Sequence, residues 1–194
     1  MTTATLDTAP EWKLPPKGKV GMACLITSDL AIFTIFIVAY LFYVGKSLSG
    51  PTPRVLQLPV FISVCLLSSS LSIHFAVSAL RRGALTAFTL WWLTTFGLGA
   101  IFLAGTAREW AHLIGEEGLR ISTNLFGTTY YSLVGLHALH VTVGLLLLGT
   151  VGVFALWRKV KQEHAEPVDA LSLYWHFVDV VWVVVFTVVY VIGR

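Results

Sequence analysis

The sequence predicts an all-α, polytopic membrane protein whose five transmembrane helices form one bundle. Of its 194 residues, 56% are apolar and only 12% are charged, and the mean hydropathy is +0.80. This composition is typical of an integral membrane protein rather than a soluble domain. Five apolar runs each reach the ~20 residues that a helix needs to cross a bilayer. One bundle uses most of the chain, so we expect residues 1–18 to form a polar N-terminal segment and residues 19–194 to form the membrane domain.

The first 18 residues are polar and contain Pro10, Pro15 and Pro16. They lack the short apolar region and small-residue cleavage site of a signal peptide, so we expect the first helix to direct insertion. The net charge of +3 comes from basic residues scattered among short loops, which argues against binding to nucleic acid. Cys24 and Cys65 fall in different apolar runs, so we expect no disulfide between them.

The five expected helices follow in order and cover residues 20–44, 56–80, 85–107, 126–157 and 171–192. Pro59 stands in the first turn of the second run, where proline is tolerated. The fourth run is longer than a bilayer requires, so we expect it to tilt or to project beyond the lipid. Small residues such as Ala100, Ala104 and Gly144 favour close contacts between helices.

Five spans place the two termini on opposite sides of the membrane, and the basic residues predict which side is which. The first side carries Lys13, Lys17, Lys19, Arg81, Arg82, Arg158, Lys159 and Lys161, and the second carries Lys46, Arg54, Arg108, Arg120 and Arg194. Because cytoplasmic loops carry the excess of Lys and Arg, we predict a cytoplasmic N-terminus and an external C-terminus.

Ionisable side chains within or beside the apolar runs are the candidate polar sites, either for proton transfer or for hydrogen bonds that stabilise the bundle. They are Asp29, His74, Glu109, His137, His140, His176 and Asp179. At a rise of 1.5 Å per residue, Asp29 lies about 15 Å beyond Lys19, deep in the bilayer. An ionised acid costs about 2.5 kcal/mol or more at that depth, and a simple membrane anchor has no need of it.

Three roles compete for these residues. The first role is structural, as a neutral side chain hydrogen-bonded between helices, and the second is proton transfer. The third is ligation of a metal or of a b-type haem, but Trp175 crowds His176 and no span shows a ladder of paired histidines. His137 and His140 share a helix face, as do His176 and Asp179. No phosphate-binding loop, nucleophile elbow or H-E-x-x-H motif occurs, so we expect no catalytic and no metal-binding residue.

Several stretches resemble those of a known family. Residues 174–182 read Tyr-Trp-His-Phe-Val-Asp-Val-Val-Trp and resemble the last-helix signature of subunit III of the haem-copper cytochrome oxidases. Residues 135–141 resemble the family's G-F-H-G-x-H-V, and residues 102–110 resemble its F-L-x-x-Q-x-x-E-[YW]. Residues 58–70 resemble L-P-x-x-N-T-x-x-L-x-x-S-S, and residues 21–29 resemble G-x-x-x-F-I-x-S-E, whose acid is the family's intramembrane carboxylate. The resemblance covers about residues 18–194.

The chain also departs from the family pattern. It resembles a short five-helix form that lacks the first two of the usual seven helices, so a partner would have to complete the family's lipid-holding cleft. Asp29 stands where the family usually has Glu, and Thr106 replaces the usual Gln. The family often has a pair of histidines where this chain has Val77 and Ser78, and His74 lies one turn away.

The resemblance implies a non-redox accessory subunit of a respiratory terminal oxidase in the bacterial cytoplasmic membrane. Such oxidases reduce O2 to water and pump protons, with their haems and copper in subunits I and II. We therefore expect no cofactor in this chain except bound phospholipid. The expected partners are subunit I, on which the chain would pack, subunit II, other oxidase subunits, membrane lipids and a larger respiratory supercomplex. The expected roles are to stabilise subunit I and to support its proton uptake.

Four alternatives stay open at this point. A quinol oxidase subunit III and an accessory protein of nitric oxide reductase would carry similar residues, which leaves the electron donor undecided. A small proton-coupled transporter would use Asp29 for its coupling ion, although no inverted repeat or pair of broken helices is visible. A b-type cytochrome would hold its own haem between histidines of facing helices.

Overall fold

The computed structural model describes residues 17–47 and 50–193, and its regular elements there are all helical. The long helices are α1 (Lys17–Tyr43), α2 (Val60–Arg81), α3 (Leu85–Gly115), α4 (Leu125–Leu156) and α5 (Ala165–Phe186). Two 3-10 turns, η1 (Pro53–Val55) and η2 (Gln162–His164), lie in loops, and a π-helix, η3 (Thr187–Ile192), continues α5. Five segments of the described chain are long and apolar enough to cross a membrane. The predicted all-α class and the five spans are confirmed.

Three helix boundaries differ clearly from the expected ones, and the other shifts are smaller. α2 begins at Val60 rather than near residue 56, because Pro59 takes the N-cap position and the residue before a proline disfavours helical backbone. α3 continues past residue 107 to Gly115. α5 begins at Ala165 rather than residue 171, and its first turn carries Glu166, an acid that favours the positive end of the helix dipole.

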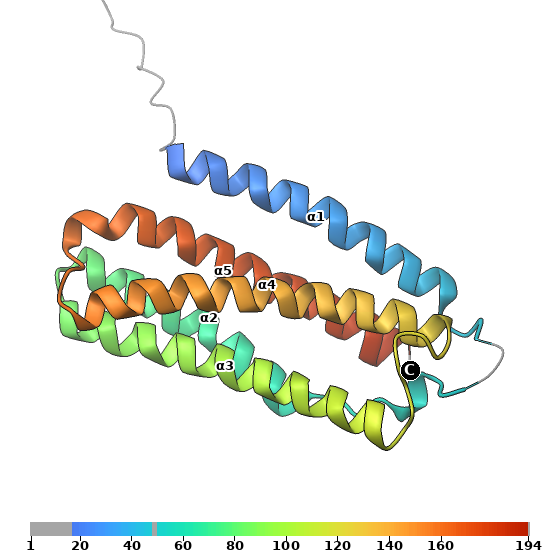
Figure 1. Cartoon of the computed structure of the whole chain (residues 1–194). Helices are drawn as coiled ribbons and strands as arrows, with labels where there is room; N and C mark the ends of the chain where they lie inside the picture. The colour runs from blue at the N-terminus through green and yellow to red at the C-terminus, as the bar shows by residue number, and fades with distance from the viewer. Residues whose placement is uncertain (1–16, 48–49, 194) are drawn as a thin grey trace, which may run out of the picture.

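The helices alternate in direction, so the start of α1, the end of α2 and the start of α5 meet at one end of the bundle (Figure 1). We call it the basic end, because its described residues include Lys19, Arg81, Arg82, Arg158, Lys159 and Lys161. The other end, here the Glu109 end, carries Lys46, Arg54, Arg108 and Arg120. Lys13 and Arg194 lie outside the described residues. The predicted orientation of the two ends across the membrane stays a prediction.

α1 forms an outer edge of the bundle and packs against α4 and α5 (Figure 1). In its apolar window only 6% of the residues are buried, compared with 56% in the segment that contains α5. Phe33 and Tyr40 are its buried anchors, and the Tyr40 hydroxyl lies 3.5 Å from the carbonyl oxygen of Val189. The rest of α1 presents apolar side chains such as Ile35, which is 68% exposed, to the outside of the bundle.

Trp175 fills the space where α3, α4 and α5 meet. Its side chain is completely buried between Gly99 of α3 and Gly144 of α4. A Cβ atom at Gly99 would come within 2.8 Å of the indole ring, and one at Gly144 within 2.7 Å. Glycine at both positions therefore allows three helices to approach around one large side chain, as small residues do in membrane bundles.

Indole groups of α5 also bind serines of α2. Trp175 donates to Ser69 Oγ at 2.8 Å, and Trp182 donates to Ser63 Oγ at 3.0 Å. The two tryptophans are seven residues apart and the two serines six, which is about two turns in each helix. The two bonds thus fix the register of the antiparallel pair, and they account for both tryptophans of the signature at residues 174–182.

Candidate functional site

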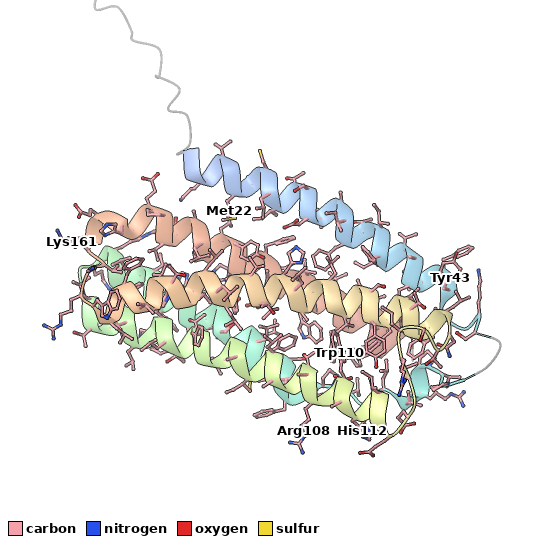
Figure 2. All side chains as sticks on the ribbon, viewed as in Figure 1. Met22, Tyr43, Arg108, Trp110, His112 and Lys161 are labelled. Atoms are coloured by element: carbon pink, nitrogen blue, oxygen red, sulfur yellow. The ribbon has the colours of Figure 1, made fainter. Side chains whose placement is uncertain are left out.

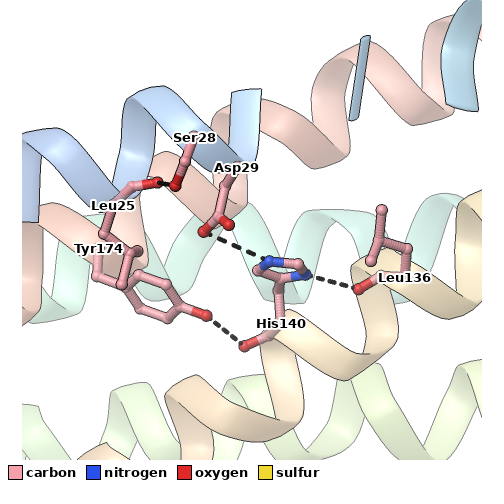
Figure 3. A network of polar contacts seen from close by, with 6 residues as sticks. All are labelled: Leu25, Ser28, Asp29, Leu136, His140 and Tyr174. Carbon is pink, nitrogen blue, oxygen red and sulfur yellow. Dashed lines mark hydrogen bonds and ion pairs between the residues drawn. The ribbon is translucent and has the colours of Figure 1, made fainter. Parts of the chain in front are cut away.

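A half-buried acid and histidine join the middle of α1 to the middle of α4. Asp29 Oδ2 lies 3.5 Å from His140 Nε2, and the two side chains are 16% and 14% exposed. Figure 3 shows them pointing toward each other from the two helices. The second ring nitrogen of His140, Nδ1, lies 2.8 Å from the carbonyl oxygen of Leu136. Tyr174 of α5 donates to the carbonyl oxygen of His140 at 3.1 Å, so three helices meet at this pair.

Asp29 and His140 lie within ion-pair distance of each other, with Nε2 facing the carboxyl group. The Leu136 carbonyl can only accept a hydrogen bond, so we assign a proton to His140 Nδ1 and leave Nε2 as the nitrogen that gains or loses one. The contact can be an ion pair, or a neutral carboxyl group beside a neutral imidazole. The pair has no net charge in either form, which avoids the cost of an isolated charge in lipid.

A second polar cluster lies between α2 and α5. Ser70 Oγ donates a short hydrogen bond to Asp179 Oδ2, and His176 Nδ1 lies 3.0 Å from the same hydroxyl. Because the single Ser70 proton goes to Asp179, His176 donates its Nδ1–H to Ser70. In a nucleophilic triad the histidine lies between serine and acid, whereas here the serine is in the middle. The cluster is therefore a hydrogen-bonded chain from the buried Asp179 to His176.

His176 and His74 line a cavity at the basic end of the bundle, on α5 and α2. His74 is exposed and has an edge contact with the Phe75 ring, at 6.0 Å between ring centres. The Oδ1 atom of Asp179, at the inner end of the cluster, is buried without a hydrogen-bond partner among the described residues. The cluster thus runs from a cavity at the bundle surface to an acid inside it.

Glu109 lies at the opposite end of the bundle, inside α3 rather than in the loop that follows. Its Oε1 accepts hydrogen bonds from Tyr190 of η3 at 3.0 Å and from Tyr130 of α4 at 3.3 Å. The two phenol oxygens are 3.3 Å apart, and both tyrosines are buried. Glu109 therefore ties three helices together at this end, and the π-helix is the element that carries Tyr190 to it.

The neighbours of Glu109 on α3 have other surroundings. Figure 2 shows Arg108 and His112 pointing away from the bundle and Trp110 pointing toward α4. The Trp110 ring contacts Tyr131 edge to face, with 5.4 Å between the ring centres. His112 Nδ1 lies 3.0 Å from Glu116 Oε2, one turn further along α3.

His137 is completely buried and is surrounded by aromatic rings. It stacks on Trp182 with 4.9 Å between ring centres, and Phe102 and Phe33 approach edge-on at 5.7 Å and 6.5 Å. Neither of its ring nitrogens has a hydrogen-bond partner in the described part of the chain. These surroundings support a packing role for His137.

The structure places the four candidate histidines, His74, His137, His140 and His176, in three separate places. His140 faces Asp29, His137 is enclosed by aromatic rings, and His74 and His176 share the cavity. Within residues 17–47 and 50–193, no group of three or more His, Cys, Asp and Glu side chains is placed to hold a metal ion. The expectation that haems and copper belong to partner subunits stays a prediction.

Sequence reasoning identified the ionisable residues but missed their neutral partners. It listed Asp29 and His140 separately, and the structure brings them together across two helices. It missed Ser70, Tyr130 and Tyr190, because hydroxyl side chains in apolar helices show no distinctive pattern. The run of three serines at 68–70 is the one signal that could have pointed to Ser70.

Comparison with known proteins agrees with the motifs. A family model described as "Cytochrome c oxidase subunit III" matches residues 16–194. The chain is 40% identical over 187 residues to cytochrome c oxidase subunit 3 of Synechocystis, covering 92% of this chain and 77% of that protein. It is 34% identical over 199 residues to the protein of the same name from Bacillus sp. PS3, covering 100% and 96%. It is 29% identical over 177 residues to quinol oxidase subunit 3 of Bacillus subtilis, covering 90% and 86%.

Proposed function

Because this chain belongs to the cytochrome c oxidase subunit III family and is an accessory subunit of a haem-copper oxidase, we propose that it packs on subunit I and supports proton uptake there. Family membership implies association with other oxidase subunits, and five helices that can span a bilayer mark it as a membrane protein. We propose that it resides in the bacterial cytoplasmic membrane with its N-terminus inside. In this proposal haems and copper belong to subunits I and II, and this chain holds none.

The proton-uptake role rests on the Asp29–His140 pair. Both side chains keep a small exposed fraction, 16% and 14%, at the edge of the bundle, so a proton can reach the pair from outside the chain. The pair holds that proton without a net charge, which a group inside a membrane must do to exchange protons at low cost. α1 carries the acid and is the least buried helix, which leaves its outer face available to a partner subunit.

The proposed electron donor of the complex is cytochrome c. The relatives that are 40% and 34% identical to this chain are named cytochrome c oxidase subunit 3. The quinol oxidase relative is 29% identical, so quinol is the alternative donor. Purification through a tag on this chain, followed by O2 consumption with reduced cytochrome c and with quinol, decides between them. Activity with quinol alone would keep the family and change the oxidase.

The proton-uptake role is tested with Asp29→Asn in the purified complex. The amide cannot exchange a proton with His140, so we expect slower proton uptake during turnover and faster inactivation of the oxidase. Ser28→Ala is the matched control, because the adjacent Ser28 hydroxyl donates to the carbonyl oxygen of Leu25 in its own helix (Figure 3). If Asp29→Asn leaves proton pumping, turnover stability and subunit retention all unchanged, the proposed role is wrong.

A further inference from the structure

A cavity of about 320 Å³ lies at the basic end of the bundle, between the start of α1, the end of α2 and the start of α5. Its lining includes two cationic side chains, Lys19 and Arg81, which come from different helices. The Asp29–His140 pair is not part of this lining. α1, α2 and α5 supply all of its lining.

Asp169 holds the two cations side by side at the cavity. Its Oδ2 lies 2.7 Å from Lys19 Nζ, and its Oδ1 lies 2.8 Å from Arg81 Nη2. The acid is the least exposed of the three, at 20%, while Lys19 is 43% and Arg81 58% exposed. One carboxylate balances one of the two positive charges, so the triad keeps a net charge of +1. Lys19 and Arg81 also retain N–H donors that Asp169 does not use.

Neutral hydrogen-bonding groups complete the lining. His176 uses Nδ1 for Ser70, which leaves Nε2 as the ring nitrogen available to the cavity. His74 and Ser78 line the same space from α2. Gln162 Nε2 donates to the carbonyl oxygen of Arg81 at 2.6 Å and so fixes the backbone that carries one of the cations. The groups around the cavity therefore combine an excess positive charge with several hydrogen-bond donors.

We propose that this cavity binds the phosphate group of an anionic phospholipid. A phosphate has a negative charge and acceptor oxygens, which can bind the cationic N–H donors of Lys19 and Arg81. The cavity lies where three membrane helices begin or end, which is the level of lipid headgroups. Val77 and Leu173 are the apolar part of the lining. Leu173 is 41% exposed, so it offers an apolar surface to the acyl chain of a lipid whose phosphate occupies the cavity. Basic cavities between membrane helices are known sites for anionic headgroups.

The test measures lipid binding by the oxidase complex purified through a tag on this chain and stripped of its lipid. Phosphatidylglycerol, phosphatidylcholine and inorganic phosphate are titrated separately, and the bound lipid is counted by native mass spectrometry. We expect saturable binding of phosphatidylglycerol that neither phosphatidylcholine nor an excess of inorganic phosphate displaces. Displacement by inorganic phosphate would overturn the lipid as the ligand, and equal binding of both lipids would overturn the site.

Variants of the triad make the test specific. Lys19→Gln and Arg81→Gln should each weaken phosphatidylglycerol binding about fivefold, the effect of one basic residue near a membrane surface. Arg82→Gln is the matched control, because Arg82 is the exposed neighbour of Arg81 and does not line the cavity. An equal loss with Arg82→Gln would mean that the lipid responds only to overall charge, and the proposal would fail.

Asp169→Asn separates lipid binding from a purely structural role of the triad. The amide releases both cations from their shared carboxylate and raises the net charge of the cavity. We therefore expect phosphatidylglycerol to bind more tightly to this variant than to the original complex. A structural ion-pair triad predicts the opposite sign, because the helices would loosen and lipid binding would fall. The experiment measures lipid binding alone, so its result tests the lipid site independently of the proposed role in proton uptake.

Discussion

At the scale of single residues, each candidate acid within the long helices is held by a group on another helix. Ser70 donates to Asp179, Tyr130 and Tyr190 donate to Glu109, and His140 faces Asp29. Hydroxyl donors satisfy a carboxyl group without bringing a second charge into the membrane. The exception is Asp29, whose partner can itself take the proton, and this difference singles it out among the acids.

Replacement of Ser70 by alanine should destabilise the chain by about 1–3 kcal/mol, the usual cost of leaving a buried polar group unpaired. Asp179 Oδ2 and His176 Nδ1 would both lose their partner. Unfolding in a denaturing detergent, followed by tryptophan fluorescence, measures the change. Ser68→Ala is the control, since the described structure gives that half-buried hydroxyl no partner. Equal effects of the two substitutions would contradict the proposed chain of hydrogen bonds.

At the scale of helices, the bundle depends on how α5 fits among its neighbours. Trp175 lies between Gly99 and Gly144, and Trp182 binds Ser63 near the start of α2. Large indoles on one helix thus meet glycine and serine on three others. This complementarity, rather than an apolar driving force that lipid would also satisfy, holds helices together in a membrane.

Alanine at Gly99 should destabilise the bundle by about 1–3 kcal/mol, because its Cβ would overlap the Trp175 ring and overpacked sites cost that much. Gly97→Ala provides a matched control two residues earlier on α3, where no atom lies within 4 Å of the added Cβ. We expect this control to be neutral or stabilising, since alanine favours a helix more than glycine does. Thermal unfolding of the complex in mild detergent measures both, and a loss shared by Gly97→Ala would contradict the packing argument.

The bond between Trp182 and Ser63 can be isolated by a double-mutant cycle. Trp182→Phe and Ser63→Ala should show a coupling of about 0.6 kcal/mol, the average for hydrogen bonds between membrane helices. Detergent-induced unfolding of the original chain, the two single variants and the double variant provides the four free energies. Additive effects, with no coupling, would show that the bond does not set the register of α2 and α5.

At the scale of the whole molecule, the sequence predicted the number and order of the helices, because lipid sets the length of an apolar run. It ended the third helix at residue 107, before Glu109, and it could not show that Tyr130 and Tyr190, far away in the chain, hold this acid. It also could not show that the Trp175 ring packs between Gly99 of α3 and Gly144 of α4. Such contacts depend on packing between distant segments, whereas each span depends on its own composition.

The predicted orientation can be checked in intact cells with a membrane-impermeant thiol reagent. Glu117→Cys lies in the loop after α3, at the Glu109 end, and Lys161→Cys lies between α4 and α5, at the basic end. We expect labelling of the first and protection of the second until the membrane is opened. The unchanged chain, whose Cys24 and Cys65 lie inside helices, is the control. The reverse labelling pattern would invert the orientation.

The position of Trp175 on α5 also determines when its contacts can form during synthesis. Chains are synthesised from the N-terminus, so α5 leaves the ribosome after α2, α3 and α4 have entered the membrane. Until then the slot between Gly99 and Gly144 has no occupant from this chain, and Ser63 and Ser69 have no indole to bind. A nascent chain that stops before Ala165, where α5 begins, has four spans but lacks Trp175. Insertion of α5 is thus the step that completes the packing among α2, α3 and α4.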